Sequence, residues 1–507
     1  MPTTNLFALE ADPRLDDPMP YAIKAIDLFV REMPANRMQF AIGKSSSNEE
    51  KAIAAKQRRP RAIFLVRLEL AYGTEMKQTL IACSGDRPSF GWLDKRPDRS
   101  PDQKLKDLIA LVEAARTIYL KNGRHFNSPF ELWHRCYEEV AAHGEALGHE
   151  SLSASYASAM FERAVIDAVC RAENTSFFGM VKEDKLGIVP EAVHPELKGI
   201  QLSDHLPAAP RTRFSIRHTV GLADPITSDD LKPEDRVNDG EPETLKEYAQ
   251  RDGLKYFKVK ISGDPEKDLN RLDTIWNEVL IHLEEPAITL DGNEAYRDLK
   301  TFAQFVSDFE VKLPGLFQHT LFIEQPLTRA LTHDPTTADW VKAIAKRKPL
   351  VIDEADGTND SFKKAFAIGY AGTSHKNCKG VFKSLLNRAL CFYFEEQTGR
   401  ETFLTGEDLS NMPIVPIHQD FATLSVLDID HCERNGHHYG FGLSHLTQEE
   451  KDRVLKNHPD LYNRRGNEVF LKIQNGEVET GSLQTPGFGG STQPDWDELT
   501  PLDDWSW

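Results

Sequence analysis

Eight short apolar segments recur between residues 214 and 430, and amphipathic helical patterns separate them. Several of the segments are continuous apolar runs, which is typical of strands buried on both faces. Strands that alternate with helices favour parallel βα units. Eight such units predict an α/β fold, a closed (β/α)8 barrel with its active site at the carboxyl ends of the strands. The predicted strands are FSIRHTV, KYFKVKI, AITLD, LFIEQ, LVIDE, YAGTSHK, ETFLTG and LSVLDID.

The part of the chain before the barrel predicts a smaller α+β domain. Residues 23–31 and 63–70 alternate apolar and polar side chains, as strands of a sheet with one solvent-exposed face do. A polar, charged stretch at residues 43–60 predicts a surface loop between them. Helical patterns follow at residues 103–121 and 153–171.

Composition excludes several classes of function. The net charge of −18 disfavours nucleic acid as a partner, because phosphate binding needs a basic face. No apolar run reaches about 20 residues, so we expect no membrane span. The six cysteines show no CxxC spacing, and the acidic N-terminal residues do not resemble a secretory signal. We therefore expect reduced thiols and a cytoplasmic location.

Ionisable residues end five successive predicted strands, the second to the sixth. One barrel unit is about 30 residues long, and the spacing of these residues is close to that length. A barrel therefore brings them together around one mouth. The residues are Lys258 and Lys260, Asp291, Glu324, Asp353 and Lys376.

Three of these residues are carboxylates, and no cysteine or histidine stands beside them. Asp291, Glu324 and Asp353 therefore favour a hard cation bound through oxygen, and Mg²⁺ fits best because it leaves water positions open to a substrate. Glu354 follows Asp353 and must point to the opposite face of the strand, so only one of the two can be a ligand. Asn293 shares the face of Asp291, where it can orient the ligand or the substrate.

The lysines supply candidate bases. Lys258 and Lys260 are two residues apart and can both face the barrel interior, and Lys376 lies across the barrel on the sixth strand. A buried ammonium near a divalent cation is expected to have a lowered pKa, which makes a neutral amine available as a base. Such a base beside Mg²⁺ suits removal of a proton α to a carboxylate, because the cation stabilises the enediolate.

Five short motifs resemble the enolase superfamily, specifically its mandelate racemase and muconate lactonizing enzyme branch. They are KVK at 258–260, DGN at 291–293, IEQP at 323–326, DE at 353–354 and HKNCKG at 375–380. The resemblance implies that Asp291, Glu324 and Asp353 bind one Mg²⁺ per site, and that Lys260 and Lys376 are the two bases.

The resemblance also implies a domain organisation. A capping domain is expected to consist of the N-terminal α+β part together with a C-terminal segment, which the stretch NGEVETGSLQTPGFG at 475–489 resembles. The expected limits are 1–210 for the cap, 211–434 for the barrel and 435–507 for the returning segment.

Two features bear on the subgroup. TGEDLSN follows the seventh predicted strand and has no histidine where the racemases and acid-sugar dehydratases carry one, which favours the two-lysine, muconate-lactonizing-like subgroup. The eighth predicted strand ends in Asp428 and Asp430, similar to the DxD motif with which dipeptide epimerases hold an ammonium group. An acidic turn at the end of a strand explains that pair equally well.

The expected function is that of a Mg²⁺-dependent isomerase or lyase that abstracts the proton α to the carboxylate of a small substrate. The outcome is an epimerisation or racemisation, a cycloisomerisation or a dehydration. The alternatives are an acid-sugar dehydratase with a non-standard base and a catalytically silent, metal-binding barrel. Relatives commonly assemble, which leaves a homo-oligomer open. The sequence fixes neither the substrate nor the role of the extended loop at 33–60.

Overall fold

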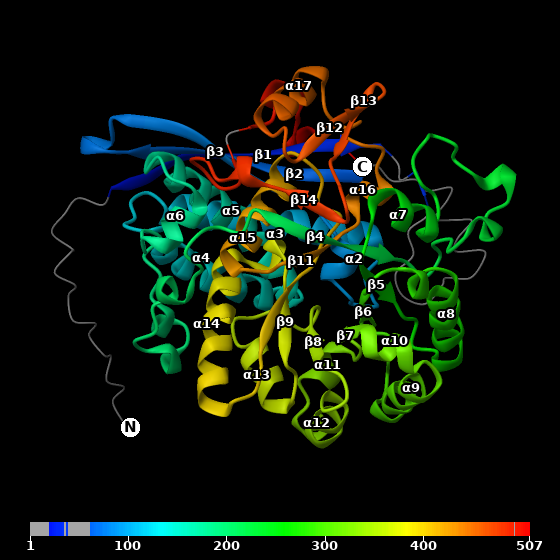
Figure 1. Ribbon diagram of the computed structural model, residues 1–507. Helices are drawn as coiled ribbons and strands as arrows, with labels where there is room; N and C mark the ends of the chain where they lie inside the picture. The colour runs from blue at the N-terminus through cyan, green and yellow to red at the C-terminus, as the bar shows by residue number, and fades with distance from the viewer. Residues whose placement is uncertain (1–19, 35–36, 39–60, 491, 507) are drawn as a thin grey trace, which may run out of the picture.

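The computed structural model describes residues 20–34, 37–38, 61–490 and 492–506. At its centre is a barrel of eight parallel strands (Figure 1). The strands pair in chain order, and β11 closes the barrel against β4. The predicted (β/α)8 barrel is therefore confirmed. The strands are β4 (Arg213–Val220), β5 (Tyr256–Lys260), β6 (Ala287–Asp291), β7 (Thr320–Glu324), β8 (Leu350–Ile352), β9 (Gly372–His375), β10 (Phe403–Gly406) and β11 (His431–Arg434).

Helices follow the barrel strands and cover the outside of the barrel. Their apolar residues pack on the strands: in α9, for example, Phe302, Phe305, Val306 and Phe309 recur at helical spacing and are buried. The helices are α7 (Leu245–Asp252), α8 (Pro265–Glu278), α9 (Leu299–Lys312), α10 (Pro314–His319), α11 (Arg329–Thr332), α12 (Ala338–Ala345), α13 (Ser361–Ile368), α14 (Val381–Thr398) and α15 (Val415–Leu427).

The eighth strand differs from the prediction. LSVLDID does not form a strand, because its LSVL part ends α15 and Asp428 follows in a left-handed turn with φ 55°. The strand is β11, in the next residues, HCER. Helix α15 is buried along its whole length, so its end has the continuous apolar run of a buried strand, and periodicity alone cannot separate the two.

A second layer lies above the barrel in Figure 1 and forms the predicted cap. Its antiparallel sheet has the order β15–β1–β2–β3, and three long helices accompany it. The C-terminal strand β15 pairs with β1 through Phe29 and Pro501, so both ends of the described chain contribute to one sheet. The elements are β1 (Tyr21–Met33), β2 (Arg61–Tyr72), β3 (Gln78–Asp86), β15 (Thr500–Pro501), α3 (Pro101–Asn122), α4 (Pro129–Ala146) and α5 (Ser151–Ala172).

Shorter elements connect the two layers. Strand β14 pairs antiparallel with β4, while β12 and β13 form a separate hairpin. The expected surface loop at 43–60 lies outside the described residues, and the expected domain limits stay predictions. The remaining elements are α2 (Phe90–Leu93), α6 (Phe177–Lys182), α16 (Gly436–Tyr439), α17 (Gln448–Asn457), β12 (Tyr462–Arg465), β13 (Glu468–Leu471) and β14 (Glu477–Glu479).

None of the helices in the described part of the chain is both long enough and apolar enough to span a membrane. All six cysteines are buried and free.

Candidate active site

The sheet register places the predicted carboxylates side by side. Lys260 is the Cα partner of Asp291, and Asp291 is the partner of Glu324. Asp353 follows directly after β8, the next strand. Parallel strands that end together bring their last side chains to one edge. The three carboxylates are fully buried at the carboxyl end of the barrel.

Lys258 lies at the centre of this end of the barrel, surrounded by carboxylates. Its Nζ is 2.9 Å from Asp291, 2.7 Å from Glu324, 2.5 Å from Glu407 and 3.1 Å from Glu433. Burial alone would lower the pKa of Lys258, but these four charges raise it well above its usual value. Lys258 is therefore a buried ammonium that holds four strands together, and it is not a neutral amine.

The two lysines predicted as bases each contact one predicted ligand. Lys260 Nζ is 2.6 Å from Asp291, and Lys376 Nζ is 2.7 Å from Asp353. Lys379 also approaches Asp353, at 3.4 Å. Burial favours a lower pKa for Lys376, but the charge of Asp353 outweighs it and raises the pKa. The lowering expected beside a bound divalent cation therefore stays a prediction.

Gln325 fixes the backbone that carries Asp353. Its Oε1 accepts hydrogen bonds from the N–H groups of Asp353 (2.7 Å) and Ala355 (3.1 Å). Its Nε2 donates to the carbonyl of Leu327 (2.7 Å) and to Thr332 Oγ1 (3.0 Å). The oxygen and the nitrogen of the Gln325 amide thus both form hydrogen bonds that hold the turn after β8. These bonds orient the carboxylate of Asp353 through its backbone.

Glu354, the residue after Asp353, joins the barrel to the cap. Its Oε1 accepts hydrogen bonds from Asn293 Nδ2 (2.9 Å) and from the indole Nε1 of Trp92 (3.0 Å). Burial and the neighbouring charge of Asp353 raise the pKa of Glu354 to about 7. The face of the Trp92 ring lies 4.2 Å from Lys376 Nζ, a cation–π distance.

A cavity of about 360 Å³ opens at this mouth, between the barrel and the cap segment 87–92. Lys260, Lys376 and Asn293 line the cavity on its polar side. Trp92 and Phe90 form an apolar wall. The structure therefore brings the two predicted bases to one cavity of a size that suits a small molecule.

Sequence reasoning missed two acids at this mouth, Glu407 and Glu433. Glu407 contacts Lys258 and forms an ion pair with the buried Arg217, whereas Glu433 accepts a hydrogen bond from Thr219 Oγ1 at 2.6 Å. Glu407 stands directly after β10, in the position that identified the other acids, so the same rule would have found it. Glu433 was hidden because the eighth strand was assigned too early.

Asp428 and Asp430 do not belong to the site. Asp428 forms an ion pair with Arg211 at 2.6 Å, and the carbonyl of Asp430 accepts from the N–H of Ser215 near the start of β4. Both residues precede β11 and lie at the amino end of the barrel. The predicted DxD contact with a substrate is therefore wrong, and the acidic turn is the correct interpretation.

The residues fit a hard cation in their chemistry. Both carboxylate oxygens of Glu324 are buried without a hydrogen bond among the described residues, and they lie beside Asp291. Burial, followed by the charge of Asp291, raises the pKa of Glu324 well above its usual value. In the described chain, no three Asp, Glu, His or Cys side chains are close enough together to enclose a metal ion. The ammonium of Lys258 stands between the carboxylates instead.

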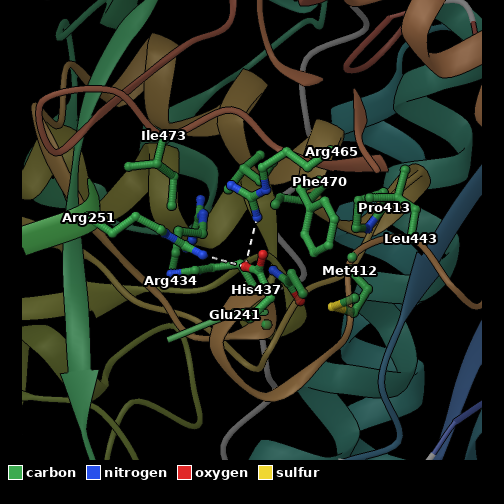
Figure 2. A pocket seen from close by; sticks show the side chains of 15 residues that line it. Glu241, Arg251, Met412, Pro413, Arg434, His437, Leu443, Arg465, Phe470 and Ile473 are labelled. Carbon is green, nitrogen blue, oxygen red and sulfur yellow. Dashed lines mark hydrogen bonds and ion pairs between the residues drawn. The ribbon is translucent and has the colours of Figure 1, made fainter. Parts of the chain in front are cut away.

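A second cavity lies apart from these lysines (Figure 2). Its volume of about 20 Å³ leaves room for one or two waters. Figure 2 shows Arg251 and Arg465 pointing at Glu241, whose Oε2 is 2.5 Å from the first and 2.7 Å from the second. Glu241 thereby ties the segment after β4 to the β12–β13 hairpin, and the cavity is too small for a substrate.

No protein-family model matches this sequence, and no curated protein matches it. Solved structures match over nearly the whole chain. An isomerase from Streptomyces coelicolor has a TM-score of 0.55 and 13% identity, over 93% of this chain and 97% of that chain. A mandelate racemase/muconate lactonizing enzyme from Roseovarius nubinhibens has a TM-score of 0.53 and 13% identity, over 96% and 100%. The chain has the fold of the enolase superfamily.

Another match with the enolase fold was solved with bound Mg, an enolase from the alphaproteobacterium BAL199. It has a TM-score of 0.55 and 12% identity, over 94% of this chain and 98% of that chain. An enolase from Mycobacterium smegmatis, solved with tartrate, has a TM-score of 0.54 and 11% identity, over 96% and 90%. The predicted resemblance is thus confirmed for the fold, and the activity must be argued from the residues of this chain.

Proposed function

We propose that this chain is an enolase-superfamily enzyme that removes the proton α to the carboxylate of a small acid. The observation that supports this most is the placement of Lys260 and Lys376, which line one cavity and each contact a different candidate metal ligand. An enzyme with one lysine on each side of a substrate can take a proton from one face and return it to the other.

Asp291, Glu324 and Asp353 are the residues that would hold Mg²⁺. Their carboxylates are buried and supply hard oxygen donors, and the oxygens of Glu324 accept no hydrogen bond among the described residues and have the ammonium of Lys258 beside them, which favours a cation at this place. Bound Mg²⁺ would supply positive charge to the substrate carboxylate and so make the neighbouring C–H more acidic. One neighbour with this fold was solved with bound Mg, which supports the choice of cation.

The remaining side chains prepare the cavity for the reaction. Asn293 and Trp92 hold Glu354 by two hydrogen bonds, and the ring of Trp92 lies against Lys376 Nζ. An enediolate formed in this cavity would be stabilised by whichever lysine remains protonated. The two-lysine arrangement fits an epimerisation, a cycloisomerisation or a dehydration. Six buried, free thiols fit a cytoplasmic location.

Hydrogen exchange at the α-carbon tests the proposal without knowledge of the product. Candidate acids are incubated in D₂O with Mg²⁺, and loss of the α-proton signal is followed by NMR. The parent should exchange, and Lys260→Ala or Lys376→Ala should each slow exchange from one face by about 10²–10⁴-fold. Exchange as fast as the parent in both variants would refute the assignment of the bases.

Magnesium binding is measured separately, by calorimetry on the unliganded protein. Glu324→Gln should weaken binding by about tenfold or more, whereas Glu310→Gln, in an exposed ion pair with Arg347, should leave it unchanged. A parent that binds Mg²⁺ but exchanges no proton would favour the catalytically silent, metal-binding barrel, and a parent that binds no Mg²⁺ would refute the metal site.

A further inference from the structure

Arg87 begins the cap segment that covers the active-site cavity. It follows β3 directly, and it lines the cavity together with Trp92, Lys260 and Lys376. The segment is held in place on the barrel, because the guanidinium of Arg329 donates to the carbonyls of Trp92 (3.0 Å) and Leu93 (3.2 Å). Arg87 therefore belongs to a segment whose backbone is anchored to the barrel, and such anchoring helps a binding residue to keep its position.

The acids nearest to Arg87 already have partners. Asp86 forms a buried ion pair with Arg163 at 3.0 Å. From Arg87 it accepts a hydrogen bond of the backbone N–H, at 2.8 Å, and none of the guanidinium. Asp408 accepts hydrogen bonds from the N–H groups of Asn411 (2.8 Å) and Asn435 (3.0 Å). Neither carboxylate is placed to neutralise the guanidinium by direct contact.

The guanidinium of Arg87 is accordingly a cation without a counterion at contact distance. Within the described ranges the structure gives it neither a hydrogen bond nor an ion pair, and its Nε is buried without a partner. Burial lowers the pKa of Arg87, which is the effect of taking a cation out of water without full compensation. A partly buried charge of this kind is unfavourable until an anion reaches it.

The other cations in the cavity differ from Arg87 in this respect. Lys260 and Lys376 each contact a carboxylate of the barrel, at 2.6 Å and 2.7 Å. Cations that are already paired add little attraction for a second negative group. Two acids also line the cavity, but Asp408 is bonded to backbone N–H groups and Glu433 is paired with Lys258. The cation of the cavity that lacks a carboxylate at contact distance is therefore Arg87, on the cap side.

We propose that Arg87 binds a second anionic group of the substrate, a carboxylate or a phosphate, so that the substrate is a small dianion. The inference rests on the proposed function, in which the first carboxylate lies at the metal end of the cavity beside the lysines. Arginine suits the second group because its planar donors match the oxygens of either anion.

The test compares ligands that differ only at the distal end, in the presence of Mg²⁺. Tartrate and threonate differ by one carboxylate in place of a hydroxymethyl group, and 3-phosphoglycerate and glycerate differ by one phosphate. Dissociation constants are measured by calorimetry for the parent, Arg87→Gln and Arg87→Lys. Arg135→Gln is the matched control, because Arg135 forms a surface ion pair with Glu131 on α4.

In the parent, at least one dianion should bind about tenfold or more tightly than its monoanionic match, and the preferred pair identifies carboxylate or phosphate. Arg87→Gln should abolish that preference while the affinity for the monoanion changes by less than about twofold, and Arg87→Lys should restore part of it. The control should bind as the parent does.

Two results would overturn the inference. One is a parent that binds no dianion more tightly than the matched monoanion. The other is an Arg87→Gln variant that loses affinity equally for both ligands of a pair while its circular dichroism stays that of the parent. The proposed function would survive either result if α-proton exchange of monoacids still depends on Lys260 and Lys376.

Discussion

At the scale of single residues, the carboxyl end of the barrel depends on one ammonium group. Lys258 has four carboxylates within 3.1 Å, those of Asp291, Glu324, Glu407 and Glu433. Removing one partner from a buried charged network is costly because the remaining charges stay buried. Lys258 therefore contributes to the stability of the metal-free protein whether or not it takes part in catalysis.

Replacement of Lys258 by Met, which keeps the length and removes the charge, should lower the free energy of unfolding by about 3–5 kcal/mol in EDTA. The loss should be smaller in Mg²⁺, because the cation compensates the same carboxylates. Urea unfolding in both buffers measures the two values. Lys267→Met, at an exposed pair with Asp264, should change stability by less than about 0.5 kcal/mol. Equal stability of Lys258→Met and the parent in EDTA would contradict this account.

Gln325 acts on the site through the backbone of Asp353. Gln325→Leu should lower the free energy of unfolding by about 2–4 kcal/mol, because the buried N–H groups of Asp353 and Ala355 lose their acceptor. It should also weaken Mg²⁺ binding by about tenfold, as loss of a ligand's support does. Calorimetry and urea unfolding measure the two effects. Gln304→Leu, exposed on α9, is the control, and full Mg²⁺ affinity in Gln325→Leu would refute the role.

Single residues of the site could largely be predicted from the sequence. Asp291 and Glu324 each end an apolar run and Lys376 ends a predicted strand, and a barrel converts that position into a place at the mouth. The raised pKa of Lys258 could not be predicted, because it depends on distances to carboxylates from other strands. Lys258, for example, contacts Glu407 and Glu433, which are separated from it by much of the barrel sequence.

At the scale of elements, strand order was easier to predict than strand boundaries. Seven strands lie in the predicted segments, because helical patterns separate them clearly. The eighth was wrong because α15 is buried on all sides and lacks the polar face that identifies a surface helix. The error moved the expected acids from Glu433 to Asp428 and Asp430, at the opposite end of the barrel.

Helix α5 joins the cap to the barrel through a buried acid. Glu162 Oε1 accepts a hydrogen bond of 2.6 Å from the N–H of Phe382, in the first turn of α14. Burial raises the pKa of Glu162 to about 7, although this hydrogen bond and the charge of Arg163 oppose the shift. The folded protein therefore keeps a proton on Glu162 that the unfolded chain releases near pH 4.5.

Stability should thus fall as pH rises from about 4.5 to about 7, and Glu162→Gln should remove this contribution. The contribution is on the order of 3 kcal/mol, and it should be lost progressively over that window, so the variant should be more stable than the parent at pH 8. Urea unfolding of both proteins at pH 5, 6, 7 and 8 measures the difference. Glu138→Gln on α4 is the exposed control. A variant that is less stable than the parent at every pH would show that the charge is compensated.

At the scale of the whole molecule, the cap sheet needs residues from both ends of the chain. The sequence predicted that a C-terminal segment returns to the cap, but it did not predict the strand pairing, because β15 is only two residues long. Side-chain packing marks the return more clearly than strand pairing does. Trp505 lies 5.7 Å from the Phe64 ring and donates to Glu32 at 3.0 Å, and Trp496 lies 5.4 Å from Phe29.

A chain that ends at Gly490 should be less stable and should aggregate. It loses β15 and the buried residues Leu499, Leu502 and Trp505, each of which contributes about 1.5–3 kcal/mol by burial. It also exposes the edge of β1 at Phe29 and Val30, where backbone groups freed from β15 can pair with another molecule. Thermal unfolding and light scattering measure the two effects. A chain that ends at Trp505 keeps these contacts and should behave as the parent does, so equal behaviour of the two truncated chains would show that the segment after Gly490 does not stabilise the cap.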